Sequence, residues 1–173
     1  MNWYVVDKKY VSYLQKFDKR VGYVEYGEKL KLHIGIIIGV DGFKYYIPVS
    51  SPKSKHAKMK NSVDFHKIID PETKTLFAVF NINNMIPVPD SCVTQLKYNT
   101  IDKFRTFANE KEKTDYIYLL QNEKAVIDRL GNVLKIKAQK LLFKVCEDPE
   151  SNLAKRCCNF RLLQEKSKEY CKQ

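Results

Sequence analysis

The sequence has no apolar run long enough to span a membrane, and this absence argues against a membrane protein. The most apolar stretch, Ile34 to Val40, has the length of a buried strand, far short of the roughly 20 residues that span a bilayer. The first seven residues lack the basic start of a secretory leader. We therefore expect a cytoplasmic protein without a membrane partner, and a length of 173 residues predicts one domain, residues 1–173.

Metal-binding and disulfide patterns are also missing. The cysteines are odd in number and none forms a C-x-x-C pair; they are Cys92, Cys146, Cys157, Cys158 and Cys171. Adjacent Cys157 and Cys158 suit neither a zinc site nor an ordinary bridge. The acidic residues are scattered, so no carboxylate cluster for Mg²⁺ is evident. We expect reduced thiols and neither a metal nor another cofactor.

Acidic side chains are too few to balance the basic ones. The chain has 31 Lys+Arg against 20 Asp+Glu, a formal net charge of +11. Such an excess favours a polyanionic partner, although it is also compatible with a merely solvated surface. The lysines gather in two groups: Lys53, Lys55, Lys58 and Lys60 near His56, and Lys135, Lys137, Lys140 and Lys144 on a helical pattern. All of them except Lys53 are candidate phosphate contacts.

Repeats and low-complexity tracts are absent, and the chain divides into a β-rich part, about residues 1–98, and a helical part, about residues 99–173. In the first part the pattern predicts four strands, a helix that starts at Asp7 and a loop over Gly22 to Glu28. The strands are Trp3 to Val6, Lys31 to Val40, Phe43 to Val49 and Leu76 to Ile82, and Asp41-Gly42 predicts a hairpin between the second and third.

Apolar spacing in the second part predicts three helical stripes. They contain Tyr116, Leu119 and Leu120; then Ile127, Leu130, Leu134, Ala138, Leu141 and Val145; and finally Phe160, Leu163 and Tyr170. Gly131 inside the second stripe disfavours the helix by about 1 kcal/mol relative to alanine, and Asp148-Pro149 predicts its end. An antiparallel sheet with helices packed on it, an α+β fold, follows from this order.

The most informative segment is Val49-Ser50-Ser51-Pro52-Lys53-Ser54-Lys55-His56, which leaves a predicted strand. A serine hydroxyl and a lysine ammonium can hold phosphate oxygens and stabilise a pentacoordinate state. His56 titrates near neutrality and suits proton transfer. From composition alone, such a turn is more often only a turn. His33 and His66 are expected to be structural or exposed.

Beyond composition, the sequence contains several blocks in a fixed order: Tyr4 to Asp18, His33-Ile34-Gly35-Ile36, Gly42 to Pro48, Ser50-Ser51-Pro52-Lys53-x-x-His56, Phe80 to Val88, and Asn159 to Lys166. This ordered set resembles the ToxN/AbiQ/CptN family, endoribonuclease toxins of type III toxin–antitoxin and abortive-infection systems. The blocks run along nearly the whole chain. The short serine–lysine string is weak alone, but the ordered set is specific.

The resemblance implies a Kid/MazF-like fold, a twisted, barrel-like antiparallel sheet with packed helices. It also implies metal-independent, sequence-preferring cleavage of substrate RNA that leaves 2′,3′-cyclic phosphate and 5′-hydroxyl ends. The inhibitor would be a small repeated antitoxin RNA folded as a pseudoknot, and toxin and RNA would form a closed hetero-oligomer.

At the positions that match the family's motif, the resemblance implies that Lys53 and Ser51 are the strongest catalytic candidates. Ser50, His56, Tyr10 and Tyr26 are further candidates, with Tyr26 displaced by one residue from the family spacing; both tyrosines could instead belong to the core. We expect attack of a substrate 2′-OH on its own 3′-phosphate, with Lys53 and Ser51 on the phosphate oxygens. His56 or a tyrosine would handle a proton.

Two alternatives from other classes stay open at this stage. A non-catalytic basic RNA-binding module would use the same lysines without strand scission, and it ranks first if the resemblance is set aside. A regulator of duplex DNA would need a recognition element, and no helix-turn-helix pattern is evident in the sequence.

Overall fold

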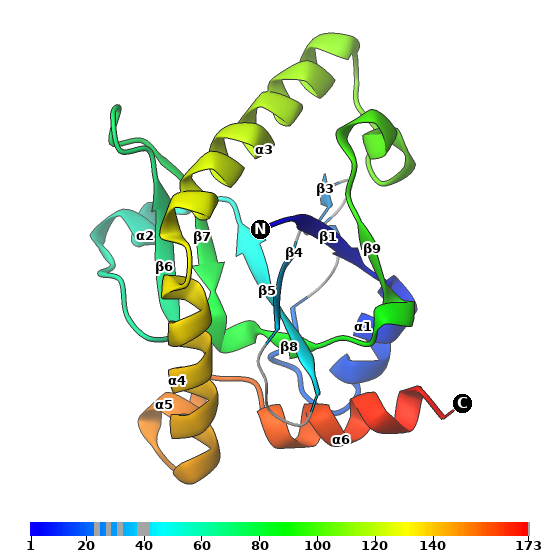
Figure 1. The fold of residues 1–173 in the computed structure, drawn as a ribbon, viewed down its shortest axis with the longest axis vertical. Helices are drawn as coiled ribbons and strands as arrows, with labels where there is room; N and C mark the ends of the chain where they lie inside the picture. The colour runs from blue at the N-terminus through cyan, green and yellow to red at the C-terminus, as the bar shows by residue number, and fades with distance from the viewer. Residues whose placement is uncertain (23–24, 27–28, 31–32, 38–41, 173) are drawn as a thin grey trace.

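The computed structural model describes residues 1–22, 25–26, 29–30, 33–37 and 42–172. Within this part of the chain, seven strands form one curled antiparallel sheet, in the order β6-β7-β5-β4-β1-β9 with β8 beside β5 (Figure 1). These strands are β1 (Trp3–Val6), β4 (His33–Ile37), β5 (Lys44–Ser50), β6 (Phe65–Ile69), β7 (Leu76–Asn81), β8 (Ile86–Pro87) and β9 (Val93–Gln95). A separate ladder pairs β2 (Glu25–Tyr26) with β3 (Lys29–Leu30).

Strand β5 is the central strand of the sheet. Its residues from Tyr45 to Val49 are buried, as expected for an aromatic and β-branched run. One edge pairs with β4 over five residues. The other edge is shared by two strands, since β8 pairs with Tyr45 and Tyr46, and β7 pairs with Val49 and Ser50. The strand is therefore held on both sides up to its last residue.

Two helices close the core below the sheet. The side chain of Asp7 accepts a hydrogen bond from the backbone N–H of Tyr10 and caps α1 (Lys8–Gln15), which buries Tyr10, Val11 and Leu14. Helix α6 (Phe160–Tyr170) contacts both α1 and β8, and Asn159 caps it. In Figure 1, α6 crosses beneath β8.

A second helical layer runs along the β6–β7 side of the sheet (Figure 1). It consists of α3 (Glu110–Leu130) and α4 (Val133–Glu147), followed by the short α5 (Asn152–Lys155). Leu134, Ala138, Leu141 and Val145 of α4 are buried, which confirms that stripe as core. The remaining elements are α2 (Ser54–Lys58) and the 3₁₀ turns at Ile82–Asn84, Asp90–Cys92 and Tyr98–Lys103.

The fold confirms several sequence predictions and corrects others. The strand Trp3–Val6, the hairpin partners β4 and β5, and the helix end before Asp148 are as expected. The long apolar stripe is not one helix, because Gly131 has a positive φ of 50° and separates α3 from α4. Leu119, expected in a buried stripe, is 37% exposed, while its neighbour Leu120 is buried.

Strands β3, β6, β8 and β9 have no counterpart among the predicted strands. In the expected loop over 22–28, residues 25–26 form β2, and 23–24 and 27–28 lie outside the described residues, as do 31–32 and 38–41 of the predicted hairpin. All five cysteines are free thiols. Within the described residues, no helix combines the length and the apolar character needed to cross a bilayer.

Candidate active site

The polar segment that follows β5 is displayed at the rim of the sheet. Val49 is buried, Ser50 is half-buried, and Ser51, Pro52 and Lys53 are exposed. The chain leaves the sheet at Ser50 because β7 pairs no further than that residue. A rigid strand therefore presents a short exposed segment, which is the usual construction of a functional loop.

Ser50 is fixed by a neighbouring strand. The side-chain amide of Asn81, the last residue of β7, donates a hydrogen bond of 2.9 Å to the Ser50 hydroxyl oxygen. This contact makes Ser50 an anchor for the exposed residues that follow it. Sequence reasoning did not assign Asn81 to the site; the only signal was its place in the block from Phe80 to Val88.

His56 holds the backbone of Lys53. The Lys53 N–H donates to Nδ1 of His56 at 3.0 Å, and the His56 N–H donates to the Lys53 carbonyl at 2.8 Å. The ring is buried and packs against Phe65, with 5.6 Å between ring centroids. Because a backbone N–H can only donate, Nδ1 carries no proton here.

The surroundings of His56 keep its ring neutral. Burial is the main cause that lowers its pKa, and the positive charges of Lys55 and Lys53 lower it further. A neutral ring whose Nδ1 is already occupied suits positioning of Lys53 better than proton transfer at a substrate. His56 was a catalytic candidate from the sequence, and the geometry supports it as a positioning residue.

The Ser51 hydroxyl and the Lys53 ammonium project from the segment that these contacts hold. Both residues are exposed, and within the described part of the chain no carboxylate forms an ion pair with Lys53. Lys55, Lys58 and Lys60 are exposed on and after α2. The closest acidic residue in sequence, Asp64, is buried and paired with Arg156, so its charge is compensated there.

The loop that follows α2 is tied to the helical layer. The Asp64 carboxylate accepts hydrogen bonds from the Ser62 hydroxyl at 2.7 Å and from Nε of Arg156 at 2.6 Å. Burial raises the pKa of Asp64, but these two hydrogen bonds outweigh it and the pKa lies below its usual range. The carboxylate therefore stays charged and keeps the loop on Arg156.

Lys137 forms a second tie from α4 to this loop. Its ammonium donates to the Ser62 carbonyl at 2.7 Å and lies 2.9 Å from Nδ1 of His66. Burial lowers the pKa of Lys137, and burial followed by the Lys137 charge lowers that of His66 to about 4. Lys137 was a candidate RNA contact, but its ammonium is occupied within the protein. Lys135 and Lys140 are exposed and remain candidates.

The structure places one of the two candidate tyrosines, Tyr10, away from the exposed segment. Tyr10 is fully buried, its hydroxyl donates to the Pro87 carbonyl at 2.6 Å, and burial raises its pKa. It belongs to the core, which was the alternative weighed for it. Tyr26 lies on β2, opposite Lys29, and its side chain is outside the described residues. Across the described residues, no three His, Cys, Asp or Glu side chains gather as metal ligands.

A model of a known protein family matches nearly the whole chain. The family model for toxin ToxN of the type III toxin–antitoxin system matches residues 2–168. The chain belongs to this family.

Two relatives of this ToxN-family chain illustrate the similarity. It is 25% identical over 182 residues to the endoribonuclease AbiQ of Lactococcus lactis subsp. lactis, covering 100% of this chain and 91% of that protein. It is 27% identical over 179 residues to the endoribonuclease ToxN of Pectobacterium atrosepticum, covering 100% of this chain and 95% of that one.

Solved structures show the same fold. One, from work on a processed non-coding RNA that regulates a bacterial antiviral system, has 25% identity and a TM-score of 0.81 over 98% of both chains. Another is AbiQ, a lactococcal anti-phage endoribonuclease of the type III toxin–antitoxin system, with 22% identity and a TM-score of 0.80 over 99% of this chain and 98% of that one. The predicted α+β fold with a curled antiparallel sheet is confirmed.

Proposed function

We propose that this ToxN-family chain is a cytoplasmic endoribonuclease toxin that an antitoxin RNA pseudoknot inhibits within a closed protein–RNA assembly. The observation that carries the proposal is the exposed pair of Ser51 and Lys53, held at the rim of the sheet by His56 and Ser50. Relatives across the whole chain are endoribonucleases of such systems, which supports the same activity here.

The proposed reaction is an intramolecular transesterification of RNA. The 2′-oxygen of one ribose forms a bond to its 3′-phosphorus, and the bond from phosphorus to the 5′-oxygen of the next nucleotide breaks. The 2′-OH loses its proton and the leaving oxygen gains one, so the products carry a 2′,3′-cyclic phosphate and a 5′-hydroxyl. In-line geometry and charge stabilisation suffice for such a step.

Lys53 and Ser51 supply that stabilisation in the proposal. The Lys53 ammonium would neutralise the charge that develops on the non-bridging oxygens, and the Ser51 hydroxyl would donate a hydrogen bond to the same oxygens. The neighbouring lysines on α2 would hold adjacent phosphates and position a preferred sequence. Because protein cations would neutralise the charge that develops on the phosphate oxygens, we propose that cleavage proceeds without a metal ion.

The test compares Lys53→Ala with the wild type on a structured transcript in the presence of EDTA. We expect the cleavage rate constant to fall about 100-fold or more, because a preorganised charge at the transition state is lost. Affinity for antitoxin RNA should change little, since one phosphate contact among many is removed. Lys97→Ala, a change at an exposed lysine outside the segment, serves as the control and should cleave like the wild type.

The competing function is a basic RNA-binding module without catalysis, which the exposed lysines of α2 and α4 favour. It predicts tight RNA binding with no new 5′-hydroxyl ends in EDTA for any variant. Equal cleavage by Lys53→Ala and the wild type would instead remove Lys53 from the reaction and leave the enzyme assignment standing.

A further inference from the structure

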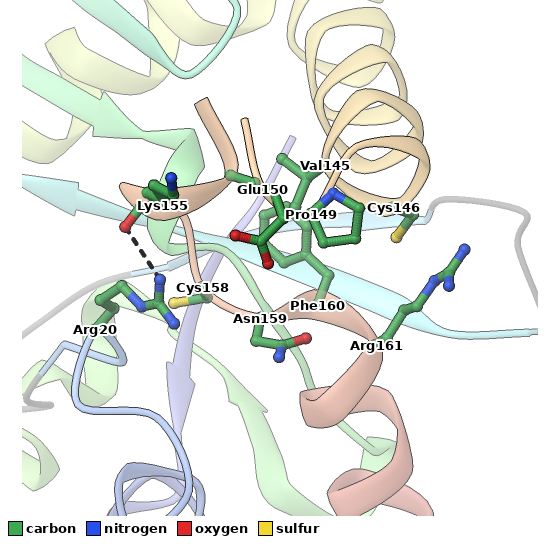
Figure 2. Close-up of a pocket in the computed structure, with 11 residues that line it drawn as sticks. Arg20, Val145, Cys146, Pro149, Glu150, Lys155, Cys158, Asn159, Phe160 and Arg161 are labelled. Carbon is green, nitrogen blue, oxygen red and sulfur yellow. Dashed lines mark hydrogen bonds between the residues drawn. The ribbon is translucent and has the colours of Figure 1, made fainter. Parts of the chain in front are cut away.

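A small cavity opens where α4, α5 and α6 meet, and none of its lining residues belongs to the 50–56 segment (Figure 2). Its volume is about 170 Å³. Pockets for drug-sized ligands begin near 300 Å³, so this one has room for about one ring system. Buried Val145, Ala154 and Phe160 line it, and the exposed ring of Pro149 adds a further apolar wall.

Cationic side chains surround the opening. In Figure 2, Arg20 and Arg161 lie on opposite sides of the pocket, with Lys155 next to Arg20. Arg20 is fixed, because its Nε donates to Asp18 at 2.9 Å and its Nη1 donates to the Lys155 carbonyl at 3.1 Å. Among the described residues, no carboxylate pairs with the side chains of Lys155 and Arg161. Two cations are thus available to a ligand.

A carboxylate and an amide lie between these cations. Figure 2 places the Glu150 carboxylate and the Asn159 side chain between Arg20 and Arg161. The oxygen of the Asn159 side chain already accepts from the Leu162 N–H, which leaves its NH₂ group as a donor. Glu150 has no ion pair or hydrogen bond within the described residues. The pocket therefore offers an acceptor-only group beside donors.

The apolar wall, the cations and the Glu150 carboxylate together favour one class of ligand over others. A free phosphate or an acidic peptide would meet the Glu150 charge as well as the cations, and an apolar ligand would leave the charged rim unmatched. A nucleotide fits both the apolar wall and the charged rim, since its base is flat and its phosphate is anionic. Among RNA bases, guanine alone presents two adjacent N–H donors on its Watson–Crick edge, which one carboxylate can accept in parallel.

We propose that this cavity binds an unpaired guanine nucleotide of an RNA. The base lies against the apolar wall with its edge on Glu150, and the adjoining phosphate contacts Arg161, on the side of the pocket opposite Lys155. Lys155 is followed by Arg156, which pairs with Asp64 in the loop after α2. The identification of RNA as the natural ligand rests on the proposed function.

The experiment titrates the full chain with guanosine, adenosine, cytidine and uridine 5′-monophosphates and follows backbone amide signals by NMR. We expect the guanosine nucleotide to shift signals of Lys155, Asn159 and Arg161, and to bind about 10-fold more tightly than the other three. In Glu150→Gln this preference should fall to near parity, because a bidentate acceptor is lost. In Arg161→Gln all four nucleotides should weaken alike.

Arg129→Gln, a change at an exposed arginine of α3, is the matched control and should bind as the wild type does. Equal binding of the four nucleotides to the wild type, or a guanosine preference that survives Glu150→Gln, would overturn the pocket assignment. The transcript assay in EDTA tests the proposed function separately. Cleavage of the transcript without guanosine selectivity in the titration refutes only the pocket assignment. Guanosine selectivity without any cleavage refutes only the proposed function.

Discussion

A histidine, His56, holds the backbone of Lys53 in place at the candidate site. His56 occupies the third position of α2 and reaches back to the backbone N–H of Lys53, as glutamate or glutamine does in a capping box. The three-residue spacing in Ser-Pro-Lys-x-x-His follows from this geometry. Protonation would place a hydrogen on Nδ1, where the Lys53 N–H now donates. Because the pKa of His56 is lowered, the ring stays neutral and keeps the contact even below its ordinary pKa, and the contact is lost as the pH falls through the lowered value.

Replacement of His56 distinguishes positioning from proton transfer. In His56→Asn the amide oxygen can accept from the Lys53 N–H, so we expect cleavage within about tenfold of the wild type. The pH–rate profile between about pH 6 and about pH 9 should keep its shape. In His56→Ala no acceptor remains, and the rate should fall further. An equal, large loss in both variants, with one limb of the profile gone, would make His56 an acid or base instead.

Elements with strong local patterns were predictable, and elements held by distant contacts were not. Strand β5 differs from its prediction by one residue at each end, since its apolar run and the glycine turn before it are local signals. Strand β6 buries His66, whose ring nitrogen lies beside Lys137 from α4. That partner is 71 residues away in sequence, so no local pattern could show that a buried histidine is satisfied there.

The contact between β6 and α4 predicts a pH-dependent stability. His66 has a pKa lowered from 6.5 to about 4, so below pH 6.5 the unfolded chain binds a proton that the folded chain does not. The free energy of unfolding should therefore decrease by about 3 kcal/mol as the pH falls from about 6.5 to about 4. His66→Gln should lose this component in urea titrations across that range. An identical pH dependence in the variant would assign it to other groups.

Helix α2 and helix α4 differ in what their lysines can contribute to RNA binding. Lys55 and Lys58 are exposed, so Lys55→Gln and Lys58→Gln should each reduce the slope of log Kd against log salt by about one unit or less. Lys137→Gln should leave the slope unchanged and lower stability, because that ammonium is bonded to the Ser62 carbonyl. Lys97→Gln is the control. A salt-independent affinity would show that these lysines are merely solvated.

For the whole molecule, the sequence located the motif, and the structure shows what holds it. Ser50 to His56 could be found from their chemistry and from the family resemblance. Asn81 of β7 and Phe65 of β6 support this segment, and Lys137 of α4 and Arg156 after α5 hold the loop that follows α2. Such supports depend on tertiary packing, and a single sequence gives no periodicity for them.

The central claim is that RNA bound at Ser51 and Lys53 is cleaved by its own 2′-hydroxyl. The most direct measurement uses an RNA substrate with one 2′-deoxynucleotide immediately 5′ of the mapped cleavage position, in EDTA, beside the all-ribose substrate. We predict cleavage of the all-ribose substrate to a 2′,3′-cyclic phosphate and no cleavage at the deoxy position. Scission at the deoxy position at a similar rate would contradict the account, because no 2′-oxygen is present there to attack.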